Sequence, residues 1–207
     1  MKKLTPAVIN RALLGKLHAY PAARQSAMWE NTSGRPRTFK DALTTQLKTI
    51  QSRRCAYCGT RLREESPARD HIAPRESHPR FTFITLNLVL ACYHCNTECK
   101  GATDTVTLKH RTYRRCEFSI IHPHLDEPSH HVEFVGTLNK ILIKVVAGSQ
   151  KGRETARMFR LANVEMAKQR AKDALLDADL EHLPGNWRNG IEYAVNVPLR
   201  QKLRPPA

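Results

Sequence analysis

The sequence lacks the long apolar segment that a membrane-spanning helix needs. A run of about 18 apolar residues is the usual minimum for such a helix, and none occurs in the 207 residues. A secretory signal peptide is not expected either, because Asn10, Arg11 and Lys16 interrupt the apolar part of the N-terminal segment. The sequence therefore predicts a cytoplasmic protein that makes no contact with a membrane.

Acidic residues are scarce. Asp and Glu together number 19 against 34 Lys and Arg, which gives a formal net charge of +15. Lys and Arg bind nucleic-acid phosphates and release counterions as they do so, and this surplus therefore indicates a nucleic-acid partner. Basic residues are dense at 53–54, 61–63, 109–111 and 114–115. The alternative is a basic surface that is simply solvated.

Four of the six cysteines form two Cys-x-x-Cys pairs, Cys55/Cys58 and Cys92/Cys95. Two such pairs supply four thiolates, which suit the tetrahedral geometry of Zn²⁺. A zinc ion with four thiolate ligands has no position left for water, so we expect it to hold the fold together and not to catalyse a reaction. Cysteines that bind zinc fit a reducing cytoplasm better than a disulfide framework does. The other two cysteines remain unassigned.

The segment between the two cysteine pairs predicts a hairpin. Residues 70–72 have strand character, and Pro74 would end that strand. Residues 87–90 predict the returning strand. A helix is expected to open at Cys95 and to complete a strand–strand–helix unit.

An Asp-His pair, Asp70–His71, lies in the first of these strands. The expected arrangement presents oxygens of Asp70 and Asn96 to one small space, where a hard cation such as Mg²⁺ or Mn²⁺ would bind. His71 is neutral near physiological pH and can deprotonate a water molecule that attacks phosphorus. The alternative for His71 alone is a buried histidine that hydrogen bonds satisfy.

These motifs resemble those of HNH nucleases of the zinc-stabilised ββα-metal type. The matching residues are Cys55, Cys58, Asp70, His71, Ile72, Pro74, Asn87, Leu88, Cys92, Cys95, Asn96 and Lys100. The resemblance implies that His71 is the general base and that Asp70 and Asn96 bind the catalytic ion. It implies that Asn87 fixes the geometry of the loop and so orients His71. Asn96 stands at a position where His is the other accepted residue.

The same resemblance implies an enzyme that hydrolyses phosphodiester bonds. Duplex DNA is the expected substrate of such a centre, and an RNA substrate fits the same chemistry. Arg75 and Lys100 are the predicted nucleic-acid contacts.

A second resemblance extends past the motif. Residues 121–128, 132–134 and 153–161, together with Arg170, are similar to the downstream half of the PtuB family of Septu-type antiphage systems. It covers roughly residues 40 to 172, and its core motifs are more specific than its tail. His124 departs from the family pattern, which more often has Tyr there. The family works with an ATPase, PtuA, so the resemblance implies a PtuA-like partner and a role in bacterial defence.

The expected fold class is α+β. Apolar spacing predicts helices over residues 6–20, from Thr38 to residue 50, and from 154 to about 182. Thr38 and Asp41 resemble a capping box after a loop at 31–36. Three strands at 117–121, 132–135 and 141–146 are expected to form a small antiparallel meander.

Three segments follow from this pattern: an N-terminal helical extension (1–50), the HNH-like, treble-clef-like core (51–110), and the meander with the long helix and tail (111–207). The third is expected to pack on the core as one unit.

Two other functions share the cysteine pairs and the basic charge. One is a zinc-stabilised nucleic-acid-binding module that does not cleave, which has no need of the Asp-His pair. The other is an adaptor that mainly binds an ATPase, in which the helices outside the motif carry the function.

Overall fold

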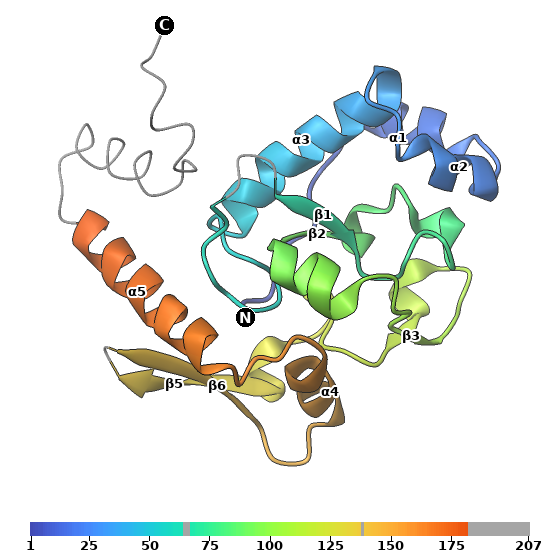
Figure 1. Ribbon diagram of the computed structural model, residues 1–207. Helices are drawn as coiled ribbons and strands as arrows, with labels where there is room; N and C mark the ends of the chain where they lie inside the picture. Colours follow the sequence, from blue (N-terminus) through green and yellow to red (C-terminus); the bar gives the residue numbers. More distant parts are fainter. Residues whose placement is uncertain (64–66, 138, 182–207) are drawn as a thin grey trace, which may run out of the picture.

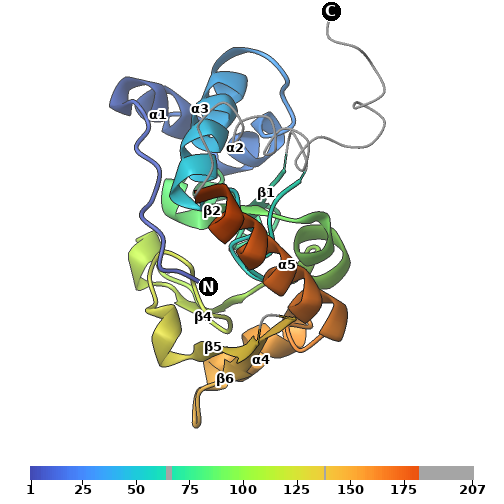
Figure 2. The same ribbon diagram turned by 90° about the vertical axis from the view of Figure 1, so that its left-hand side faces the viewer.

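The computed structural model describes residues 1–63, 67–137 and 139–181. It combines helices with three two-stranded sheets and agrees with the α+β class. Figure 1 shows the hairpin of β1 (Ala68–His71) and β2 (Leu88–Ala91) near the centre of the molecule. Figure 2 shows the three N-terminal helices at one end of the molecule and the strand pair β5–β6 at the other. No helix in the described ranges is long and apolar enough to span a membrane.

The helix expected at 6–20 is shorter than predicted, and a second helix that was not predicted follows it. They are α1 (Arg11–His18) and α2 (Ala22–Met28). The Asn10 side chain caps α1 by accepting hydrogen bonds from the amides of the second and third helical residues. Pro21 separates the helices because proline disfavours helical backbone at the residue before it.

The helix α3 (Gly34–Ile50) begins earlier than predicted and takes in the end of the expected loop. Ser33 stands at its N-cap, and the Thr38 hydroxyl donates to the carbonyl of Gly34 at 3.2 Å. Thr38 is therefore inside the helix, and the predicted capping box was wrong. The apolar stripe itself is confirmed: Phe39, Leu43 and Leu47 are fully buried.

The central hairpin confirms both predicted strands. β1 and β2 are antiparallel, with Asp70 opposite Val89 and His71 opposite Leu88. Between them the chain makes two short 3₁₀ helices, η1 (Pro79–Phe81) and η2 (Thr85–Asn87). The helix expected after β2 is η3 (His94–Lys100), which is wound as a π-helix. The hairpin thus leads straight from one cysteine pair to the other.

The predicted three-stranded meander was wrong. β3 (Val106–Leu108) pairs with β4 (Glu117–Phe118), and β5 (Val132–Thr137) pairs with β6 (Lys140–Val145), all antiparallel. After β4 the chain turns into the core, where Ile121 bonds through its amide to the Thr155 hydroxyl at 2.8 Å. Since that amide already has a partner, the segment adds no strand to the β5–β6 sheet.

The predicted long helix is two helices, α4 (Gln150–Met158) and α5 (Val164–Glu181). Phe159 and Leu161 are fully buried between them, and Arg160 has a φ of 50°. A left-handed residue ends an α-helix. The expected break at Pro184–Gly185 and the tail lie outside the described residues.

One continuous core holds these elements together. Its buried residues come from all three predicted segments, for example Leu43, Tyr57 and Phe159. The rings of Tyr57 and Phe159 stack at 4.1 Å, which fixes the first cysteine pair against the segment between α4 and α5. The three-part division of the chain stays a prediction.

Candidate functional site

The two cysteine pairs converge on one point. The Sγ atoms of Cys55, Cys58, Cys92 and Cys95 all lie within 4.8 Å of one another, and those of Cys58 and Cys92 are 3.7 Å apart. A tetrahedron with Zn–S bonds of about 2.3 Å has edges of about 3.8 Å. The four cysteines therefore fit a metal such as zinc. They are the only group of three or more His, Cys, Asp or Glu ligands found in the described parts of the chain.

Local backbone structure positions the sulfurs of the first cysteine pair, Cys55 and Cys58, toward those of the second pair. Gly59 has a φ of 75°, and its amide bonds to the carbonyl of Cys55 at 3.1 Å. Glycine adopts this left-handed turn without a Cβ clash. The amide of Ala56 bonds to the carbonyl of Leu90 at 3.1 Å, which attaches the turn to β2.

An arginine of α5 is hydrogen-bonded to the turn at residues 55–59, which is called the first cysteine turn below. The Arg170 side chain is 2% exposed, and it donates to the carbonyls of Cys58 at 3.1 Å, Ile141 at 2.7 Å and Leu161 at 2.7 Å. A charged residue on a helix is usually solvated, and Arg170 is not. The sequence signal for its burial is its place on the same helix face as the buried Ala167 and Ala171.

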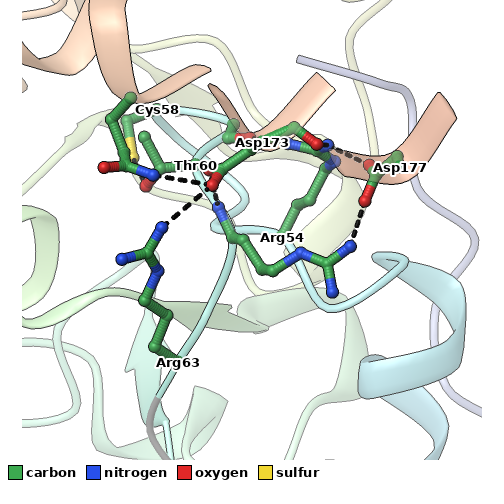
Figure 3. Close-up of polar contacts among 9 residues, drawn as sticks. Arg54, Cys58, Thr60, Arg63, Asp173 and Asp177 are labelled. Carbon is green, nitrogen blue, oxygen red and sulfur yellow. Dashed lines mark hydrogen bonds and ion pairs between the residues drawn. The ribbon is translucent and has the colours of Figure 1, made fainter. Parts of the chain in front are cut away.

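Asp173 lies one helical turn after Arg170 in α5. It binds the residues that directly follow the first cysteine turn. It is 1% exposed and accepts hydrogen bonds from the Arg61 amide at 2.7 Å and the Arg63 guanidinium at 3.2 Å. Figure 3 shows these contacts beside a second carboxylate, Asp177, which pairs with Arg54. Through these contacts α5 supports the first cysteine pair from outside the cluster.

His71 is buried at the end of β1. Its side chain is 7% exposed, and its Nε2 lies 3.1 Å from the carbonyl of Thr82. A carbonyl only accepts, so Nε2 carries the proton and Nδ1 has the free lone pair. None of the described residues hydrogen bonds to Nδ1. Burial lowers the pKa of His71 to about 3, and the indole of Trp29 covers the ring at 4.3 Å. His71 is therefore a neutral proton acceptor at physiological pH.

Asn87 holds the loop on which His71 depends. Its amide nitrogen donates to the carbonyls of Ala73 and Phe81, both at 3.0 Å. Its amide oxygen accepts from the Ala73 amide at 2.7 Å and the Tyr113 hydroxyl at 2.9 Å. All four hydrogen bonds of this fully buried side chain are made, and they tie the segment after β1 to the segment before β2.

Asp70 lies in a closed polar cluster. One carboxylate oxygen is 3.0 Å from the Lys100 ammonium, and the other accepts from the Tyr57 hydroxyl. Lys100 is buried and also donates to the carbonyl of His71 at 2.8 Å. Lys100 thus neutralises Asp70 and holds the end of β1.

Asn96, the other expected ligand of a divalent ion, is half-buried, and its amide nitrogen lies 3.4 Å from the Thr97 hydroxyl. Asp70 and Asn96 share no partner among the described residues. A divalent ion does not fit this arrangement as it stands, because both Asp70 oxygens are engaged and one already faces a cation. We therefore derive no chemical step through such an ion.

Arg75 lies between α2 and its own loop. Its guanidinium donates to the carbonyl of Ser26 at 2.9 Å and pairs with Glu30 and, at 3.1 Å, with Glu76. A contact between Arg75 and nucleic acid would have to compete with these two carboxylates.

The remaining cysteines and histidines have other partners. His94 lies 2.6 Å from a Glu98 oxygen and 3.3 Å from the Cys99 sulfur. Cys116 accepts from the His110 amide at 3.3 Å. Neither sulfur belongs to the four-cysteine cluster.

The burial of His122 is expected to make the free energy of unfolding depend on pH. It is fully buried, and burial lowers its pKa to about 2, with smaller contributions from His124 and Lys151. The unfolded chain binds a proton near the ordinary pKa of about 6.5 and the folded chain does not, so this stabilisation is lost as pH falls below that value.

Urea unfolding of wild type and His122→Gln between pH 7 and 4 measures the effect. The stability of wild type relative to the variant should fall by about 1.4 kcal/mol per pH unit below pH 6. A pH-independent difference between the two proteins would contradict the prediction.

No family model matches this sequence. Two curated proteins are similar to it. The Septu protein PtuB of Bacillus mycoides (strain KBAB4) is 23% identical over 174 residues, which cover 74% of this chain and 58% of that protein. The Septu protein PtuB of Bacillus thuringiensis is 29% identical over 96 residues, which cover 45% of this chain and 33% of that protein.

The chain is thus similar to Septu PtuB proteins at low sequence identity. The match spans little more than half the length of the first relative and a third of the second.

Proposed function

We propose that this chain is an HNH-type endonuclease that hydrolyses phosphodiester bonds of nucleic acid, most readily DNA, within a Septu-type antiphage system. The observation that carries the proposal is the placement of His71 in the hairpin next to Asp70, with Nε2 fixed by the Thr82 carbonyl and an unshared lone pair on Nδ1. The similarity to Septu PtuB proteins supports the defence setting. The net charge of +15 supports a polyanionic substrate.

In the proposed reaction, Nδ1 of His71 takes a proton from water as the water oxygen attacks phosphorus. The new P–O bond forms while the ester P–O bond breaks, and the leaving oxygen takes up a proton from solvent water, to which His71 later returns the proton that it took. The Thr82 carbonyl accepts from Nε2–H throughout and stabilises the imidazolium that forms, as an oriented dipole does in a buried site. Asn87 keeps this geometry by fixing the loop next to His71.

Zinc on the four cysteines would keep the hairpin and η3 in register and would take no part in the reaction. A requirement for Mg²⁺ or Mn²⁺, with Asp70 and Asn96 as ligands, stays part of the proposal. Binding of the ion at Asp70 requires that Lys100 release the Asp70 carboxylate. The dependence of cleavage on added metal is therefore part of the test.

The second candidate function is an adaptor for a PtuA-like ATPase. It is favoured by the outer face of the β5–β6 hairpin, where Val135 and Leu142 are cross-strand partners and both are exposed. Such a pair suits a protein contact. The two functions are compatible in one complex.

The test compares wild type with His71→Ala on plasmid DNA and on total RNA. Each is assayed with Mg²⁺ or Mn²⁺ and without added metal, in the presence and absence of the candidate ATPase. The variant should lose about 10²- to 10⁴-fold in cleavage rate, the usual contribution of a general base. Equal zinc content shows that the fold is intact, and His130→Ala is the matched control because that imidazole is exposed.

Equal cleavage rates for wild type and His71→Ala would show that His71 takes no part in the reaction. Absence of cleavage by wild type in every condition, with tight nucleic-acid binding in both proteins, would favour the non-cleaving module.

A further inference from the structure

One cavity in the described structure is lined by none of the residues around His71. Its volume is about 920 Å³. Five segments wall it: the N-terminal residues, the end of α3 with the turn that follows, the first cysteine turn, the β5–β6 hairpin and α5. Binding sites for small molecules commonly have volumes of about 300–1,000 Å³. None of the residues assigned above to the phosphodiester chemistry lines this cavity.

The cavity is strongly cationic. Six basic side chains line it, namely Lys2, Lys48, Arg53, Arg54, Arg61 and Arg170. Among the described residues that line it, the one carboxylate is that of Asp177, which pairs with both Arg54 and Arg61. A concave surface with an excess of one charge concentrates ligands of the opposite charge. The ligand that suits this cavity is therefore anionic.

The turn after α3 is held in an unusual backbone conformation at the wall of this cavity. Ser52 and Arg53 have φ values of 49° and 52°, although neither is glycine. Left-handed backbone is unfavourable for residues with a Cβ, and such outliers gather at ligand sites. The Arg53 Nε is buried and has no hydrogen-bond partner among the described residues. Strain and an unpaired donor thus occur together on a residue that lines the cavity.

The wall contributed by the β5–β6 hairpin is apolar. Phe134 and Ile141 line the cavity, and Phe134 is 44% exposed. The ring of Phe134 lies beside the first cysteine turn, 3.7 Å from the position that a Cβ on Gly59 would take. An accessible aromatic ring next to guanidinium groups suits a ligand with a planar aromatic part and a phosphate part.

We propose that this cavity binds a nucleoside phosphate, with the phosphates at Arg53 and the basic residues around it and the base against Phe134. The chemistry fits a free nucleotide and equally the terminal nucleotide of a nucleic-acid strand. The ligand would lie against the turn that carries Cys55, so its binding is expected to stabilise the metal centre. This site is separate from the proposed phosphodiester chemistry.

Calorimetric titration of the full zinc-loaded chain tests the proposal with ATP, AMP, adenosine and pyrophosphate as probes. ATP and AMP should bind, and adenosine should bind more weakly because it lacks the charge. Arg53→Gln and Phe134→Ala should each weaken ATP binding about tenfold or more, the loss expected for a charge-assisted contact or a stacked ring. Arg157→Gln is the matched control, because Arg157 is exposed and pairs only with Glu154 among the described residues.

Two results would overturn the proposal: a Kd above about 1 mM for every phosphate probe, or ATP binding by Arg53→Gln and Phe134→Ala that matches wild type. Phe134 is exposed, so its replacement keeps the test valid if the Arg53 variant folds poorly.

A 5′-phosphorylated single-stranded oligonucleotide distinguishes the two sources of the ligand. If it binds more tightly than ATP and ATP displaces it, the occupant is a strand end. If ATP binds and the oligonucleotide does not, the occupant is a free nucleotide. The His71→Ala variant should bind ATP as wild type does, so failure of the nucleotide site and failure of the nuclease proposal are seen separately.

Discussion

Cys95→Ser is expected to lose bound zinc and to melt far below wild type. Cys95 is buried, and its sulfur lies in the four-cysteine cluster at the junction of β2 and η3. Binding of structural zinc is worth about 10–16 kcal/mol in small zinc domains, which equals or exceeds the total stability of about 5–15 kcal/mol of an ordinary domain. A site with three thiolates binds zinc more weakly, and the loss of metal is therefore a loss of folding free energy.

Zinc content by elemental analysis and the melting temperature by circular dichroism measure this effect. Removal of zinc from wild type with a chelator should give the same low melting temperature as the variant. Cys99→Ser is the matched control, because Cys99 lies on the same helix and outside the cluster. A Cys95→Ser protein that retains zinc and melts with wild type would show that the cluster is not the metal centre.

Arg170→Met is expected to destabilise the fold by about 3 kcal/mol or more, because each buried carbonyl that loses its donor costs about 1–3 kcal/mol. The variant fills a similar space but leaves the carbonyls of Cys58, Ile141 and Leu161 without their donor. Each such loss is costly because these groups are shielded from water. The cysteine turn also loses its attachment to α5, and zinc should leave faster.

Urea unfolding and the rate of zinc transfer to a chelator test this expectation. Lys168→Met on the same helix is the control, since Lys168 is exposed and pairs with Glu165. Its effect should stay within about 0.5 kcal/mol. A similar small effect for Arg170→Met would mean that α5 does not support the cysteine turn.

The two stability predictions and the cleavage test address different parts of one structure. Loss of zinc or of Arg170 acts through the fold and should lower every activity. His71→Ala removes one proton acceptor and should leave zinc content and nucleotide binding unchanged. Combined measurement of melting temperature, zinc and cleavage in each variant therefore separates structural from chemical effects.

Features that depend on short spacing were predicted correctly from the residues alone. The two Cys-x-x-Cys pairs, the strands of the hairpin and the buried stripe of α3 are all visible as local patterns. A strand or a helix stripe is encoded within a few residues, because side chains alternate or recur with the period of the element. His71 was selected from the Asp-His pair between the two cysteine pairs, and Asn87 from the resemblance to HNH nucleases, and the roles of both stay predictions.

Contacts between groups far apart in the chain could not be predicted from local patterns. Arg170 contacts Cys58 across 112 positions of sequence, and no periodicity links the two. The Lys100 contact to Asp70, the pairing of β4 with β3 and the burial of His71 beneath Trp29 arise in the same way. Such contacts depend on how whole elements pack, and packing is a property of the assembled core and not of any one segment.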